Sequence, residues 1–165
     1  MTNKMIHVKC TREENAAFHK VPVNSIVRME FETYLKGVVP AEVGNAPPEC
    51  AKAQAIAART FAMPYVRKGD PITDQSSGHQ AYRAPRAVDP AYARAQAGVE
   101  GTKGMVLTYD GKVLSTCSYS ASNGGRTTSA EERWGGGRPW LIAKADPWDK
   151  AATGGVKKGH GVGMS

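Results

Sequence analysis

Five carboxylates in the sequence could supply the acid and base groups that cleave a glycosidic bond: Glu42, Asp74, Glu131, Glu132 and Asp146. Most glycosidases place one carboxylate on each side of the scissile bond, and no spacing here singles out such a pair. Glu42 differs from the rest because it lies near the end of an apolar run, residues 38–43. Burial there would favour the protonated carboxyl that a general acid needs; the alternative is a surface glutamate.

A thiol nucleophile beside a base is a second possible chemistry. Cys117 and His160 could form such a pair, and His160 lies between two glycines that would let a ligand approach. The alternative is that Cys117 is a buried strand residue. His7 and Cys10 have the spacing of metal ligands, but no second pair accompanies them. We therefore predict no metal and no cofactor.

Two cations are spaced to share one face of a helix. Pro47 and Pro48 favour the start of an alanine-rich helix from Glu49 to about Met63, which Pro64 would end or kink. Lys52 and Arg59 lie seven residues apart, so they recur on one face after about two turns, roughly 10.5 Å along the axis. The small residues of this helix suit a packed core, and we expect the two cations to face a common ligand.

The elements that must position these residues follow from periodicity and turn signals. Alternating apolar residues predict strands at 5–10 and 25–30, and helical spacing from Phe31 predicts a short helix that ends at Pro40. The remaining predictions, in chain order, are an irregular loop over 69–88, a helix from Asp89-Pro90 to Val99, a hairpin of 105–109 and 112–117 around Asp110-Gly111, and glycine-rich loops over 118–165 anchored by Trp134, Trp140 and Trp148. Together they predict an α+β fold with mixed or antiparallel strands, in which the long loop region forms a cleft.

Composition favours one folded domain over residues 1–165. The hydrophobic fraction of 41% and the charged fraction of 22% exclude wholesale disorder. A net charge of +7 suits an anionic partner such as a bacterial wall polymer, whereas the absence of a basic arm argues against nucleic acid. The longest apolar runs are too short to span a membrane. Residues 1–20 lack the apolar core of a signal peptide, so we expect none in this chain.

Several segments, collinear over roughly residues 25–165, carry a family resemblance. The most specific are Val38-Val39-Pro40-Ala41-Glu42-Val43, Lys52-Ala53-Gln54-Ala55-Ile56-Ala57-Ala58-Arg59-Thr60-Phe61-Ala62 and Gly159-His160-Gly161-Val162-Gly163-Met164-Ser165. Between them lie Asp74, Gln80-Ala81-Tyr82 and Tyr119-Ser120-Ala121-Ser122-Asn123-Gly124-Gly125-Arg126-Thr127. This series resembles the stage II sporulation protein D and amidase-enhancer family.

The resemblance implies a lytic transglycosylase that cleaves the MurNAc–GlcNAc bond of peptidoglycan without water and leaves a 1,6-anhydro end. Glu42 would act as the general acid and then as the base. The implied substrate contacts are Lys52, Arg59, Gln80, Tyr82, Ser122, Asn123 and His160. The implied setting is the cell wall outside the cytoplasm, with glycan strands and a cell-wall amidase as partners. The alternative is a non-catalytic wall-binding module that enhances an amidase, since Ser120 stands where the family often has a histidine.

Overall fold

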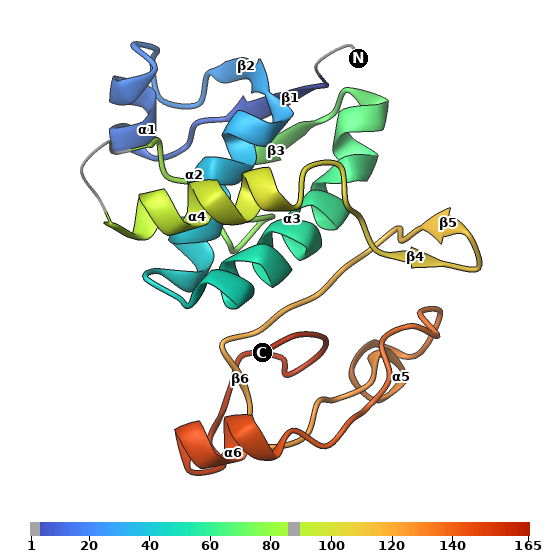
Figure 1. Ribbon diagram of the computed structural model, residues 1–165. Coiled ribbons are helices and arrows are strands. Elements are labelled where there is room, and N and C mark those ends of the chain that lie inside the picture. Colours follow the sequence, from blue (N-terminus) through green and yellow to red (C-terminus); the bar gives the residue numbers. More distant parts are fainter. Residues whose placement is uncertain (1–3, 86–89) are drawn as a thin grey trace. The chain divides into compact units, whose positions relative to one another are not determined.

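The computed structural model describes residues 4–85 and 90–165. The chain forms two compact units, Met1–Thr108 and Tyr109–Ser165, and each is described by itself. Both contain helices and strands, so the predicted α+β class is confirmed (Figure 1). None of the described helices is long and apolar enough to cross a membrane.

The first unit contains a three-stranded sheet in the order β2-β1-β3. Strand β1 (Met5–Lys9) pairs antiparallel with β2 (Ile26–Glu30) and parallel with β3 (Pro71–Thr73). Burial alternates along β1, and Ile6 and Val8 are its fully buried residues, because successive side chains point to opposite faces. The predictions for β1 and β2 are confirmed. Strand β3 was missed, since it lies within the segment predicted to be an irregular loop.

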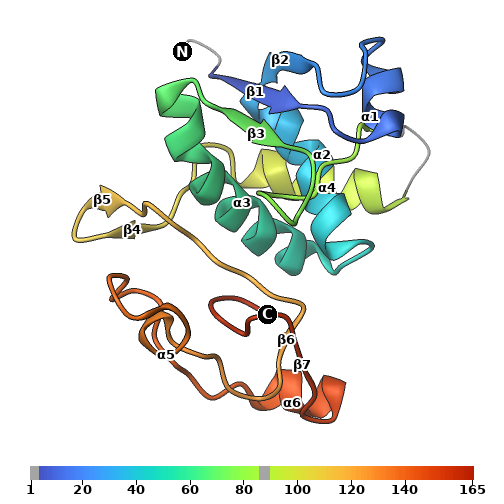
Figure 2. The ribbon, with the colours of Figure 1, turned by 180° about the vertical axis from the view of Figure 1, so that it is seen from behind.

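Within the described residues of this unit, four helices accompany the sheet: α1 (Glu13–Phe18), α2 (Phe31–Val43), α3 (Pro48–Lys68) and α4 (Pro90–Gly101). Helices α2, α3 and α4 pack against one another beside the sheet (Figures 1 and 2). Helices α2 and α3 run through Pro40 and Pro64, so the predicted helix end at Pro40 is wrong, and of the two alternatives at Pro64 the one in which it ends the helix is wrong. Each proline removes one intrahelical hydrogen bond, and the tertiary packing of these helices outweighs that loss.

Small residues bring α3 and α4 close together. Ala51, Ala55 and Ala58 of α3 are buried. Gly98 of α4 lies against Ala51, and a Cβ atom at Gly98 would come within 2.9 Å of the Ala51 backbone carbon. Backbone cannot move aside as a flexible side chain can, so the separation of the two helices is set by the absence of a side chain at Gly98.

The second unit contains four short strands and two helices. They are β4 (Thr108–Tyr109), which begins at the end of the first unit, β5 (Lys112–Val113), β6 (Ser122–Asn123), β7 (Lys157–Lys158), α5 (Ala130–Trp134) and α6 (Pro147–Thr153). Strand β6 pairs antiparallel with β7. The predicted hairpin is confirmed, although its strands are only two residues each. Asp110 and Gly111 both have positive φ, as a two-residue hairpin turn of type I′ requires.

A small core holds the second unit together. Ala130, Leu141 and Val162 are its buried residues, and Trp140 packs against them. The Trp140 Nε1–H group also donates a hydrogen bond to the Thr116 carbonyl at 3.1 Å. Trp140 is therefore an anchor, as predicted. Trp148 is 83% exposed, so the prediction that it anchors the loops is wrong. Trp134 is 44% exposed, but its ring contacts the His160 ring and the Arg138 guanidinium and so joins separate loop segments.

Replacing Gly98 by alanine is expected to destabilise the protein by about 1–3 kcal/mol, because the added methyl group overpacks the contact with α3. Gly101→Ala on the same helix is the matched control, since its Cβ would approach only the end of the Lys52 side chain, at 3.9 Å. Urea unfolding of both variants measures the difference. Equal stability of the two variants would contradict this account of the α3–α4 contact.

Candidate active site

Glu42 lies in the last turn of α2, two residues before the positive-φ Gly44 that caps the helix. Its side chain is half-buried, and Oε1 accepts a hydrogen bond from the Ala81 N–H group at 2.6 Å. Ala81 lies between Gln80 and Tyr82, so one backbone hydrogen bond joins two segments that the sequence separates by about forty residues. The carboxyl of Glu42 is thereby held in a defined position.

Asp74 fixes the segment that carries Ala81. This carboxylate is fully buried and accepts hydrogen bonds from the Thr11 N–H and hydroxyl, the Arg12 N–H and the Asn15 side-chain amide. Burial alone would raise the pKa of Asp74, but the hydrogen bonds from Asn15, Thr11 and Arg12 together outweigh it and lower the pKa below its ordinary value of 3.8. The Tyr82 N–H group donates to the Asp74 carbonyl at 3.2 Å. A buried carboxylate thus ties this segment to the start of α1.

Gln80 and Tyr82, both predicted substrate contacts, flank Ala81 in the chain and are buried. The Tyr34 hydroxyl donates to Gln80 Oε1 at 3.2 Å, and the rings of Tyr34 and Tyr82 stack with centroids 5.4 Å apart. The Tyr82 hydroxyl lies 3.1 Å from His19 Nε2, and burial raises the pKa of Tyr82 well above its usual range. We infer that these two side chains support the segment from inside the protein.

Asn15, His19 and Tyr34 are functional supports that sequence reasoning missed. Asn15 satisfies its whole amide: it donates to Asp74 Oδ2 and to the Tyr82 carbonyl, and its Oδ1 accepts from Ala84 N–H. The signal for Asn15 was weak, because a single polar residue in a short helix has no distinctive spacing. Tyr34 lay in a helix that was predicted, yet periodicity does not reveal which hydroxyl finds a buried partner.

Lys52 and Arg59 have different environments although they lie on the same helix. Arg59 is 1% exposed, and its Nη2 and Nε donate to the Glu32 carboxylate at 2.8 and 3.0 Å. The Lys52 side chain is 44% exposed and pairs with Glu49. The Arg59 guanidinium is therefore paired with protein groups, and contact of the two cations with a common ligand stays a prediction. For Lys52, contact with substrate stays a prediction.

Ser122 and Asn123 are buried in the second unit, where they bind two aspartates of α6 and its N-cap. Ser122 Oγ donates to Asp149 Oδ2 at 2.9 Å, and Asn123 Nδ2 donates to Asp146 Oδ2 at 2.8 Å. Asp149 Oδ2 also accepts from the Gly124 N–H group at 2.7 Å. These bonds attach the glycine-rich loop to α6, so both side chains serve the loop's conformation.

His160 is half-buried, and its Nδ1 accepts a hydrogen bond from the Val162 N–H group. Burial and the Arg133 charge lower the pKa of His160 below 6.5, and this lowering favours the neutral ring at pH 7. A backbone hydrogen bond to Tyr119 acts in the opposite direction and is outweighed. The Trp134 ring lies 5.3 Å away, centroid to centroid. Contact of His160 with substrate stays a prediction.

The thiol chemistry considered for Cys117 finds no support. Cys117 is buried, and desolvation raises the pKa of its thiol to about 11, so the reactive thiolate is scarce at neutral pH. Over residues 4–85 and 90–165, no group of three His, Cys, Asp or Glu side chains could hold a metal ion.

Comparison with known proteins addresses the family. Residues 20–109 match the SpoIID model, described as stage II sporulation protein, which is more than half of the chain. The chain belongs to the SpoIID family. This matched region contains Glu42, Asp74, Gln80 and Tyr82, the residues that the Asp74 hydrogen bonds and the Glu42–Ala81 bond hold together.

Two SpoIID relatives illustrate the similarity. Stage II sporulation protein D of Bacillus amyloliquefaciens is 33% identical over 144 residues, covering 77% of this chain and 41% of the relative. The amidase enhancer of Bacillus subtilis is 39% identical over 116 residues, covering 70% of this chain and 15% of the relative. The chain thus spans less than half the length of these relatives.

In this SpoIID chain, Arg59→Met is expected to cost about 3 kcal/mol of unfolding free energy, because it leaves the Glu32 carboxylate without its buried partner. Lys52→Met is the control on the same helix and should cost less than about 1 kcal/mol, since its ion pair is exposed. The double variant Arg59→Met/Glu32→Gln should regain part of the loss. Urea unfolding measures all three, and a double variant no better than Arg59→Met would refute the charge explanation.

Asp74→Asn is expected to destabilise the protein in a pH-dependent way. Because the folded pKa is lowered, the hydrogen-bonded carboxylate stabilises the fold above pH 3.8, and this contribution disappears as the pH falls through the folded pKa. The variant should therefore be about 2 kcal/mol less stable at pH 7, and the difference should shrink as the pH falls below 3.8. Asp70→Asn, an exposed neighbour, is the control. A difference that is constant with pH would show that ionisation of Asp74 is not the cause.

Proposed function

We propose that this chain is a peptidoglycan lytic transglycosylase in which Glu42 is the catalytic residue. The observation that carries the proposal is the hydrogen bond from Ala81 N–H to Glu42 Oε1 within the family-matched region. It holds one oxygen of the carboxyl at a half-buried position, which suits a positioned general acid. Membership of the SpoIID family and the similarity to stage II sporulation protein D support the same reading.

The proposed reaction uses one carboxyl group twice. Protonated Glu42 gives its proton to the oxygen that bridges MurNAc and GlcNAc, and the bond from that oxygen to C1 of MurNAc breaks with its electron pair on the leaving GlcNAc. The resulting Glu42 carboxylate removes the proton from the C6 hydroxyl of the same MurNAc. The C6 oxygen then bonds to C1 and closes the 1,6-anhydro ring, so no water is consumed and Glu42 is again protonated.

This mechanism needs one carboxyl, no cofactor and no metal. It is consistent with the failure to find a second carboxylate beside Glu42 in the sequence. The remaining parts of the proposal follow from the substrate: glycan strands are the binding partner, and the cell wall outside the cytoplasm is the place of action.

A second candidate is a non-catalytic module that binds the wall and enhances an amidase. The observation that favours it is the 39% identity to the protein named amidase enhancer in Bacillus subtilis. On this reading, the ordered Glu42 segment would recognise glycan without cleaving it, and a cell-wall amidase would be the partner.

Glu42→Gln is expected to lower the rate of glycan cleavage by at least about 100-fold, because the amide can neither give nor take the proton. The assay is mass spectrometry of products from purified glycan strands, in which wild type should leave 1,6-anhydro ends. Glu13→Gln is the matched control: this glutamate is exposed at the start of α1, and its substitution should leave cleavage unchanged. The thermal unfolding of both variants verifies that they fold.

The same samples separate the two candidates. Reducing ends in place of anhydro ends would exclude the transglycosylase reaction, and full activity of Glu42→Gln would remove Glu42 from its role. If wild type sediments with cell wall, leaves the glycan intact and accelerates an added amidase, the enhancer function is correct.

A further inference from the structure

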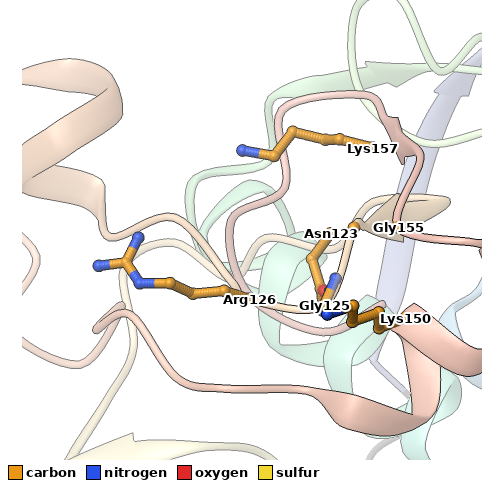
Figure 3. Close-up of a pocket in the computed structure, with 7 residues that line it drawn as sticks. Asn123, Gly125, Arg126, Lys150, Gly155 and Lys157 are labelled. Atoms are coloured by element: carbon orange, nitrogen blue, oxygen red, sulfur yellow. The ribbon is translucent and has the colours of Figure 1, made fainter.

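A pocket of about 390 Å³ lies wholly within the second unit. It is formed where the glycine-rich loop after β6 meets α6 and the start of β7, and three of its lining residues are cations: Arg126, Lys150 and Lys157. Figure 3 shows Arg126 and Lys157, from two different segments, extending to the same side of the pocket. No carboxylate is among the residues that line it.

The backbone brings the cations together through glycines. Gly124 and Gly125 have positive φ, and a Cβ atom at Gly125 would come within 2.8 Å of Lys150 Cβ. Gly155 is also in the left-handed region, just before Lys157. These conformations are costly for other residues, so the pocket depends on the loop sequence that the side chains of Ser122 and Asn123 hold in place.

The charges of the pocket are only partly compensated. Arg126 pairs with Glu132 at 2.9 Å, and the Arg126 hydrogen bonds lower the pKa of Glu132 to about 2. Lys157 donates one hydrogen bond, to the Thr128 hydroxyl, and an ammonium group has two further donors. Within the described part of the chain, neither Lys150 nor Lys157 forms an ion pair. The residues that line the pocket therefore retain a net positive charge.

We propose that this pocket binds a carboxylate group of the muramyl units in peptidoglycan. The inference rests on the proposed wall substrate and adds to it a second contact, far along the chain from Glu42. A carboxylate matches the single charges and the donors of two lysines, and charge-assisted hydrogen bonds of this kind are the strong ones. Muramyl units offer such a group in two ways: on the stem peptide, or on the lactyl group after the peptide is removed.

The test is binding to purified glycan strands, measured by sedimentation with the Glu42→Gln protein so that no cleavage occurs. Lys150→Gln/Lys157→Gln should weaken binding about tenfold, the size expected for a lost charge-assisted hydrogen bond. Lys144→Gln/Lys158→Gln is the control, because it removes the same charge from exposed residues outside the pocket. The loss should disappear on strands whose carboxylates have been converted to amides, and at high salt.

Two glycan preparations identify the source of the carboxylate, and the binding measurement keeps the inference separate from failure of the proposed function. Binding is compared on peptide-bearing strands and peptide-stripped strands, both freed of phosphate polymers. The carboxylate that the pocket binds is the one carried by the strands for which the pocket variant loses affinity. Equal binding by the pocket variant and the control variant would overturn the proposal. So would a loss of affinity in the pocket variant that is as large on amidated strands as on unmodified strands. A loss seen only on walls that retain phosphate polymers would overturn it as well. Because binding is measured without cleavage, absence of anhydro products would refute the transglycosylase and leave this result intact.

Discussion

The hydrogen bonds that converge on the Asp74 carboxylate are the interaction on which the candidate active site depends. A buried charge without a cation beside it is tolerated only when its oxygens are fully hydrogen-bonded. Thr11, Arg12 and Asn15 provide those bonds, and Asn15 simultaneously holds the backbone of residues 82 and 84. The backbone next to Ala81 is thereby held where the Ala81 N–H group reaches Glu42. The hydrogen-bond donor to the proposed acid is positioned by groups that surround Asp74.

Five of the seven residues that the resemblance implies as substrate contacts are buried. Gln80, Tyr82 and Arg59 are buried in the first unit, and Ser122 and Asn123 in the second. Their side chains form hydrogen bonds with other protein groups. Contact with a substrate would therefore depend on the few side chains at the surface of the site. A motif can therefore mark the supports of a site as strongly as the groups that meet the substrate. Lys52 and His160 are the predicted contacts that remain accessible.

The sequence predicted the elements better than the environments of their side chains. Strands β1 and β2, helix α3 and the Asp110-Gly111 hairpin follow from local periodicity and turn chemistry. Strand β3 was hidden because three residues with one buried side chain, Ile72, give no period to count. The helix end predicted at a proline failed for a related reason. The stability that a proline costs inside a helix is known from the sequence, whereas the packing that offsets this cost is not.

The same limit applies to the candidate site. The apolar frame of Glu42 was visible in the sequence, whereas its bond to Ala81 depends on a contact across about forty residues. The stripe of Lys52 and Arg59 was also visible. Spacing alone could not show that Glu32, on a different helix, takes up the second cation, because helical periodicity relates residues within one element only.

The order of the strands has a consequence for synthesis. Strand β1 is central in the sheet but first in the chain, and its parallel neighbour β3 begins only at Pro71. At about 5–20 residues per second, a ribosome needs several seconds to produce that partner. Throughout this interval, one edge of β1 has no native strand to pair with. The strand also carries the apolar side chains of Ile6 and Val8. Lys4 and Lys9 lie at the two ends of this strand. Charged side chains in such positions discourage an unpaired strand edge from pairing with another chain.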